Sequence, residues 1–144
     1  MQITSQFTIA LHSLLCIEYF SKEVKVTSNF IAESVNTNPV VIRRVLGKLK
    51  DADIINVESG VGGATIKKDL SKVTMLDIFN IINPLEKGQL FHFHENPNMK
   101  CPVGSKVHDV LDEKLYKTEN AMLEEMKKIT IKDLADDLEK NHKK

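Results

Sequence analysis

The chain has 144 residues, of which 42% are hydrophobic and 28% are charged, and its formal net charge is zero. This length is enough for one hydrophobic core, or for one small domain with an appended dimerisation element. No segment approaches the roughly 18–20 uncharged apolar residues of a membrane-spanning helix. The apolar stretch near the N-terminus lacks the preceding Lys or Arg of a signal peptide. We therefore expect a cytoplasmic protein with no membrane partner.

Basic residues are concentrated in one part of the chain. Residues 22–68 hold eight Lys or Arg against five Asp or Glu, a net +3, whereas residues 101–144 hold nine against ten, a net −1. A locally basic segment is typical of proteins that bind nucleic acid. The zero net charge therefore permits DNA binding without requiring it.

The first half of the chain predicts a helix-turn-helix. Apolar residues spaced three and four apart predict a first helix over residues 5–21. Thr27 is a suitable N-cap for a helix over residues 28–35. Asn38, which precedes a proline, marks the start of a further helix that we expect to end near residue 53. A basic second helix after a tight turn is the element that enters the DNA major groove in this motif.

A β-hairpin is expected next. Residues 54–58 and 64–68 predict its strands, and the glycine-rich residues between them predict its tip. Glycine tolerates positive φ and carries no side chain, so backbone amides of the tip can approach a phosphate or the minor groove. The alternative is a plain turn without a DNA contact. The glycines are Gly60, Gly62 and Gly63.

The second half predicts two short helices, an irregular segment and a long helix. A short helix begins after Thr74 and ends before residue 84, and a short terminal helix begins after Thr130. Between them, a long helix from about residue 105 has apolar residues at alternating spacings of three and four, as in helices that pair with a partner helix. This predicted seam consists of Val107, Leu111, Leu115, Thr118, Met122, Met126 and Ile129.

These elements predict a mainly α fold with a small β-hairpin wing. Residues 1–83 form the winged helix-turn-helix domain, residues 84–104 an irregular sensor or linker segment, and residues 105–144 the dimerisation helix with the short terminal helix. The expected architecture is thus a winged helix-turn-helix joined to a long C-terminal dimerisation helix.

The second helix of the motif carries the candidate base contacts. An arginine can bond guanine in a bidentate manner, and a valine can contact the methyl group of thymine. The alternative is that these cations form an ordinary solvated helix face. The candidate DNA-binding residues are Thr27, Ser28, Asn38, Val40, Arg43, Arg44 and Lys48, together with the three glycines of the wing.

Cys101 and Cys16 are the two cysteines, and their spacing excludes a zinc ribbon. Cys101 precedes the long helix, whose N-terminal dipole would favour the thiolate, so it is a candidate redox switch. Its alternative is a partly buried thiol without a sensing role. Cys16 stands four residues after His12 on the first helix, and these two are further candidate sensor residues.

A mixed metal site of His12 and Cys16 with His92, His94 or Glu95 is a weaker interpretation. The spacing matches no compact metal motif, and a polar helix face plus a solvated loop explains the same residues. We therefore expect no metal and no cofactor, while the irregular segment remains a candidate pocket for a small-molecule effector.

Six segments carry a resemblance to a known family: residues 3–11, 31–34, 45–55, 60–63, 73–78 and 129–134. Through them the sequence resembles, over nearly its whole length, the Rrf2 family of bacterial winged-helix transcriptional regulators. Such proteins are homodimers, joined by a long helix, that bind palindromic operators. The family members that bind an iron–sulfur cluster carry three closely spaced cysteines before that helix, where this sequence has only Cys101, so the resemblance implies no such cluster here.

We therefore expect a DNA-binding transcriptional regulator, acting as a repressor and binding a palindromic operator as a homodimer. Its activity would be modulated by an oxidant at Cys101 or by a small ligand. The alternatives are a winged-helix module that binds protein without sequence-specific DNA binding, and a small metalloenzyme built around the histidines. No nucleophile–base pair or three-ligand site supports the enzyme.

Overall fold

The computed structural model describes residues 3–58, 63–83, 90–91 and 93–142. The chain divides into two compact units. Residues 3–84 and 126–144 form the first, which we call the core unit, and residues 85–125 with 1–2 form the second, which we call the arm unit.

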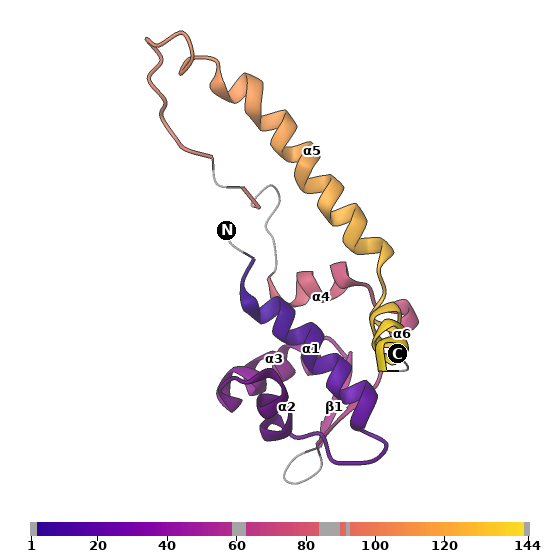
Figure 1. The fold of residues 1–144 in the computed structure, drawn as a ribbon. Helices are drawn as coiled ribbons and strands as arrows, with labels where there is room; N and C mark the ends of the chain where they lie inside the picture. Colours follow the sequence, from indigo (N-terminus) through magenta and orange to yellow (C-terminus); the bar gives the residue numbers. More distant parts are fainter. Residues whose placement is uncertain (1–2, 59–62, 84–89, 92, 143–144) are drawn as a thin grey trace. The chain divides into compact units, whose positions relative to one another are not determined.

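The core unit is helical with one two-stranded antiparallel hairpin (Figure 1). The predicted mainly α fold with a β-hairpin wing is therefore confirmed. Its elements are α1 (Ser5–Phe20), α2 (Ser28–Val35), α3 (Pro39–Asp51), β1 (Ile55–Glu58), β2 (Gly63–Ile66), the 3-10 helix η1 (Leu70–Lys72), α4 (Met75–Ile82) and α6 (Ile131–His142).

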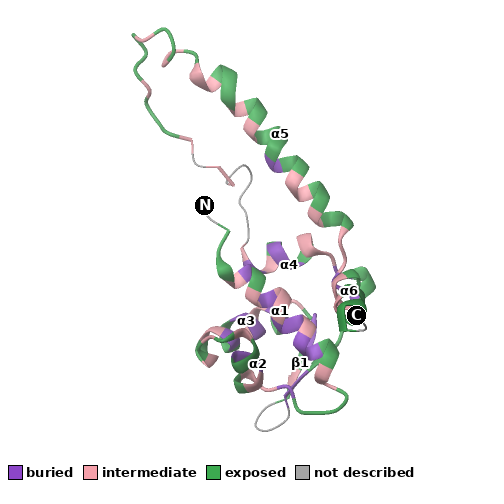
Figure 2. Ribbon diagram, in the orientation of Figure 1, coloured by how far each residue is buried: buried purple, intermediate pink, exposed green. Residues whose placement is uncertain are grey.

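Helix α1 is the centre of the core unit. It contacts α2, α3, α4 and α6, and its inner side is buried (Figure 2). Leu14 and Ile17 have no exposed surface, and Phe7 packs edge to face against Phe79 of α4, with ring centroids 5.3 Å apart. Aromatic pairs in this arrangement add to the free energy gained from burial alone. The apolar spacing in the sequence thus sets the packing of the first helix.

Three predicted helix caps are present. The Thr27 hydroxyl accepts a hydrogen bond from the amide of Phe30 at 3.1 Å. The Asn38 side chain accepts one from the amide of Val40 at 2.9 Å, and Pro39 follows as the first helical residue. Thr74 forms a reciprocal capping box with a following aspartate. Each cap satisfies an amide that the helix itself leaves unpaired.

The hairpin differs from the prediction in both strands: β1 begins at Ile55, one residue later than predicted, and the second strand is shifted. That strand begins at Gly63, which pairs with Glu58, and ends at Ile66, which pairs with Ile55. It begins one residue early because Gly63 has a φ of +78° and continues the ladder. It ends two residues early because the amides of residues 67 and 68 both donate to the carbonyl of Ile54.

The terminal helix α6 belongs to the core unit. The amide of Ile131 donates to the carbonyl of Val73, and the amide of Met75 donates to the carbonyl of Ile129, both at 2.8 Å. Ile131 has no exposed surface. The sequence analysis grouped this helix with the dimerisation helix, but its contacts are with α1 and η1.

The arm unit contains most of α5 (Val107–Lys128) and the described part of residues 90–104. Phe93 packs against Tyr116, with ring centroids 5.4 Å apart. Glu119 is the one buried residue of α5, and it accepts a hydrogen bond from the amide of Leu90 at 3.4 Å. Across the described ranges, no helix has the length and apolar character needed to cross a membrane.

Candidate nucleic-acid interface

Helix α3 has one buried face and one exposed basic face. Its apolar residues Ile42, Val45 and Leu49 have no exposed surface. Arg43 and Arg44 are exposed on the other side. Burial of the apolar face fixes the helix on the core unit, so the two guanidinium groups are free to reach an external ligand.

Val40 makes the first turn of α3 suitable for contact with a base. It is 52% exposed, which is unusual for a valine. It sits where recognition helices touch base edges, beside the Asn38 cap. An exposed aliphatic side chain in this place can contact the methyl group of thymine.

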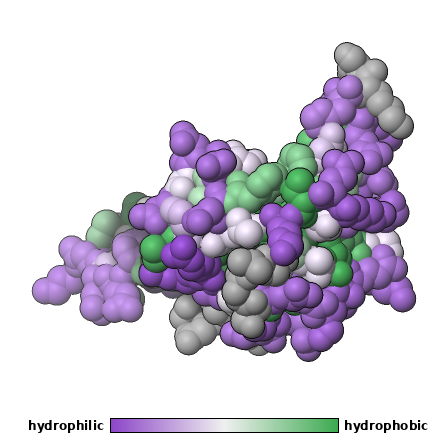
Figure 3. Space-filling model, turned by 90° about the horizontal axis from the view of Figure 1, so that it is seen from below, coloured by the Kyte–Doolittle hydropathy of each residue, from purple (hydrophilic) through white to green (hydrophobic). Residues whose placement is uncertain are grey.

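A groove of about 350 Å³ runs beside α3. Arg43, Gly47 and Lys50 line it from α3, and Thr27 and Ser28 line it from the start of α2. The structure thereby brings five charged, small or polar positions together on one surface. This surface lies at the end of the core unit that carries α2, α3 and β1 (Figure 1), and the view from below shows hydrophilic residues around a smaller area of hydrophobic ones (Figure 3).

Lys50 belongs to this surface although the sequence analysis did not include it among the DNA-binding candidates. Its spacing from Arg43 is seven residues, which is two turns of a helix, so both side chains project from the same face. That spacing was the available signal. Lys48 lies elsewhere, since its ammonium group donates to the carbonyl of Ile82 at the end of α4, at 3.4 Å.

The N-terminus of α2 adds a place for a phosphate. The Thr27 hydroxyl already accepts the amide of Phe30, while Ser28 is the first helical residue and is half-exposed. The first amides of a helix point along its axis and, with the helix dipole, favour an anion. An anion at this position would meet the first amides of α2 beside Thr27 and Ser28.

The wing is described only in part. Gly60 and Gly62 lie outside the described residues. Gly63 has the predicted positive φ, but a Cβ atom there would lie 2.9 Å from the backbone nitrogen of Val26. Its close approach is therefore to the chain itself, and the amide of Ala64 donates to the carbonyl of Val26 at 2.8 Å. Val26 hydrogen-bonds to the hairpin in this way without belonging to a strand.

Cys101 lies in a turn before α5. Hydrogen bonds from the backbone amides of Gly104 and Val103 to its sulfur hold the pKa of the Cys101 thiol below its usual value, outweighing the opposing effect of burial. From the sequence, this effect is predicted for the N-terminus of the long helix. Because α5 begins only at Val107, the turn supplies the amides. Gly104 allows that turn, since a Cβ atom there would meet the carbonyl oxygen of Asn98.

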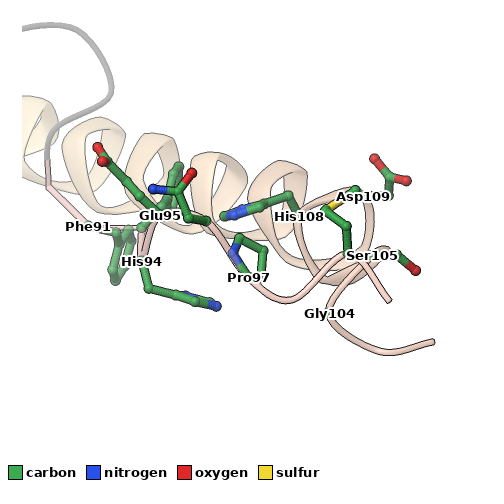
Figure 4. Close-up of a pocket in the computed structure, with 11 residues that line it drawn as sticks. Phe91, His94, Glu95, Pro97, Gly104, Ser105, His108 and Asp109 are labelled. Atoms are coloured by element: carbon green, nitrogen blue, oxygen red, sulfur yellow. The ribbon is translucent and has the colours of Figure 1, made fainter. Parts of the chain in front are cut away.

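The same part of the arm unit contains a hollow of about 950 Å³ (Figure 4). His94 comes from the irregular segment and His108 from α5, with ring centroids 5.4 Å apart. The Nδ1 atom of His108 lies 3.0 Å from a carboxylate oxygen of Asp112. His108 was missed in the sequence because the segment that faces it has no regular periodicity, and His92 lies outside the described residues.

His12 and Cys16 lie in the core unit, around the hydroxyl of Ser34 on α2. The Nε2 atom of His12 is 2.9 Å from that oxygen, and the Cys16 thiol donates to it at 3.4 Å. Within the described ranges, no group of three or more His, Cys, Asp or Glu side chains is arranged to hold a metal ion. His12 and Cys16 therefore meet at the hydroxyl of Ser34.

Three comparisons give one consistent assignment. A family model described as "Rrf2: Iron-dependent Transcriptional regulator" matches residues 3–137. The chain is 42% identical over 136 residues to YwnA of Bacillus subtilis (strain 168), covering 94% of this chain and 98% of that protein. The assignment of YwnA as an HTH-type transcriptional regulator is itself provisional.

Solved structures show the same fold. A crystal structure of a protein provisionally assigned to DNA binding is 36% identical, with a TM-score of 0.68 over 90% of this chain and 98% of the other. The global cysteine regulator CymR of B. subtilis has a TM-score of 0.69 at 16% identity, over 94% and 97% of the two chains. The winged-helix arrangement is thus shared at low identity.

Proposed function

This chain belongs to the Rrf2 family of transcriptional regulators, and from that membership we propose that it reads DNA through the exposed face of α3. The exposed stripe of Val40, Arg43 and Lys50, beside the N-terminus of α2, carries the proposal. In a major groove, the arginine would bond a guanine edge and the lysine a phosphate.

We propose further that two copies bind a palindromic operator as a repressor. The apolar seam of α5 supports pairing, because Leu115 and Met122 are only half-buried in the arm unit and Leu111 is 40% exposed. In a two-fold dimer, the two α3 helices would enter major grooves about 34 Å apart, one turn of DNA. The function would be exercised in the cytoplasm, where such an operator is accessible.

The family description names iron, and the residues present do not fit an iron or iron–sulfur site. Cys101 is the one cysteine of the arm unit, and its sulfur accepts backbone amides. The Cys16 thiol donates a hydrogen bond to the hydroxyl of Ser34 in the core unit. Since the described residues provide no three-ligand group, we propose regulation without such a cofactor.

The test compares three single variants in operator selection and binding. Arg43→Ala should lower specific affinity by about 1–3 kcal/mol and relax preference at one base pair. Lys50→Ala should weaken binding to all DNA sequences. It should also reduce, by about 1, the slope of the logarithm of the binding constant against the logarithm of the salt concentration. Lys48→Ala is the matched control, and its affinity should match the parent because its ammonium group faces Ile82.

Two results would overturn this interface. Equal affinity in all three variants would mean that α3 does not read DNA. A selection that enriches no DNA site with the parent protein, combined with protein partners recovered through the same face, would favour the protein-interaction module instead.

Cys101 is the second part of the proposal. Its thiolate should form at lower pH than an ordinary cysteine thiolate, because the Gly104 and Val103 amides stabilise the anion. The rate of iodoacetamide alkylation of a Cys16→Ser variant should therefore rise at a pH below that of an unstructured cysteine peptide. Coincident pH profiles would contradict this, and unchanged operator binding after peroxide treatment would remove its regulatory role.

A further inference from the structure

A second cavity, of about 690 Å³, lies in the core unit between α1, α2 and α6. Leu11 and Leu15 of α1 and Leu138 of α6 line its wall, with Tyr19 and Phe20 beside them. Its volume lies within the range of sites that bind small molecules, and its wall is mostly apolar, as in such sites. It is separate from the groove beside α3 and from the hollow around His94.

Aromatic side chains gather at one end of the cavity. Tyr19 is 45% exposed and lies beside His142, with ring centroids 5.3 Å apart, and beside Phe20 at 4.8 Å. Aromatic faces favour a planar aromatic guest over an aliphatic one of similar size. This end therefore suits a flat, neutral ring.

A polar end holds the only thiol of the core unit. The hydroxyl of Ser34 has one proton to donate. Because the Cys16 thiol donates to its oxygen at 3.4 Å, the Ser34 proton can point to the Nε2 atom of His12, 2.9 Å away. Thiol, hydroxyl and imidazole thus form a continuous path by which the thiol proton can reach a base.

We propose that this cavity binds a small, neutral, planar electrophile of the quinone class, which adds covalently to Cys16. The apolar wall holds the ring, and the polar end supplies both the nucleophile and the base. The proposal rests on the DNA-regulator function only for its consequence, since binding and addition are measured independently of DNA.

The addition is balanced without a further oxidant or reductant. The sulfur of Cys16 forms a bond to a ring carbon, the π electrons of that C=C bond form a new C=C bond to the carbonyl carbon, and the C=O π pair moves to the carbonyl oxygen. The thiol proton passes through Ser34 to His12 and then to that oxygen. The hydrogen on the attacked carbon moves to the second oxygen, so the product is a hydroquinone thioether.

The position of Ser34 gives the reaction an effect on DNA binding. Ser34 belongs to α2, whose first residues line the groove beside Arg43, and Phe30 of α2 packs on Phe20 at 5.0 Å. A thioether at Cys16 has no S–H proton, so the hydrogen bond from Cys16 to Ser34 is lost. The helix-turn-helix is then no longer held in its free geometry.

The experiment measures thiol modification by intact-mass spectrometry in two full-length variants. Cys101→Ser leaves Cys16 as the one thiol, and Cys16→Ser leaves Cys101. Each is treated with 1,4-naphthoquinone and, separately, with the charged reagent iodoacetate. The ratio of quinone rate to iodoacetate rate should be about tenfold higher at Cys16 than at Cys101, because only Cys16 lies in an apolar cavity.

Variants of the polar end test the proton path. In the Cys101→Ser background, Ser34→Ala should slow quinone addition about 10- to 100-fold and alter its pH profile, whereas Ser34→Thr, which keeps a hydroxyl, should restore it. Leu138→Trp should fill the cavity and block quinone without slowing iodoacetate equally. Circular dichroism melting checks that each variant is folded.

Equal rate ratios at the two thiols, or a Leu138→Trp variant as reactive as its parent, would overturn the proposal even if operator binding is normal. If the adduct forms as described but the parent protein binds no operator, the cavity assignment stands and the proposed DNA function fails. If adduct and operator binding coexist, the regulatory consequence is wrong.

Discussion

Helices α3 and α5 are both amphipathic, but only α3 has its apolar face covered within its own unit. Ile42, Val45 and Leu49 of α3 have no exposed surface. In α5, the buried residue is a carboxylate, Glu119, while Val110 is 57% exposed. Figure 2 shows this contrast along the two helices.

The difference assigns the two helices to different kinds of contact. When the apolar face of a helix is covered by its own domain, its polar face is what remains for an external ligand, and in α3 that face is cationic. In α5 several apolar side chains are left exposed or half-buried among charged ones, and exposed apolar residues of this kind are typical of an interface between subunits. The proposed DNA contact of α3 and the proposed pairing of two copies through α5 rest on this difference.

The largest expected effect is on the stability of α3. Leu49→Ala should lower the free energy of unfolding by about 2–5 kcal/mol, because it leaves a cavity at a site with no exposed surface. Leu111→Ala, on α5 and 40% exposed, should change the unfolding of the core unit far less. Urea denaturation followed by circular dichroism measures both, and equal losses would break the comparison.

A smaller but qualitative effect is expected on α5. Replacing Leu115 and Met122 together by Asp should convert a dimer to a monomer, because two charges would be desolvated at the predicted seam. Sedimentation velocity gives the mass, and the melting of the core unit should stay close to that of the parent. Glu113→Asp is a matched control on the exposed side of the helix. A double variant that remains dimeric would show that α5 does not supply the interface.

The smallest effect concerns the start of α6. The amide and the hydroxyl of Thr130 hydrogen-bond the carboxylate of Asp133 and hold its pKa below the ordinary value. This interaction stabilises the fold above the unfolded-state pKa and is lost as the pH falls through the lowered folded-state pKa. In Asp133→Asn, the melting temperature should therefore decrease less than in the parent protein as the pH falls below about 4. Asp137→Asn is the control. If the melting temperatures of the two variants depend on pH in the same way below about pH 4, the assignment is contradicted.

The elements that the sequence predicted well depend on local chemistry. Thr27, Asn38 and Thr74 cap helices through bonds to residues two or three positions ahead, so a short stretch of sequence contains the whole interaction. The basic face of α3 follows from helical spacing for the same reason. The same spacing predicts that Lys50 lies on this face.

Contacts between distant segments could not be predicted in this way. The hydrogen bond from Lys48 to Ile82 joins residues 34 positions apart, and the hydrogen bond from Cys16 to Ser34 joins residues 18 positions apart. No periodicity encodes which side chain a helix will meet on another element. The pairing of His94 with His108 depends likewise on how an irregular segment lies along α5.

The bridge between Thr74 and Thr130 has a consequence for folding during synthesis. Because α6 packs on α1 across more than a hundred residues, the arm unit must be made before the core unit can close. Such a long loop is entropically costly to close and slows folding. A ribosome-bound chain ending within α5 would therefore lack the contacts of Ile131, and the DNA-reading unit would become complete only after the arm unit has been synthesised.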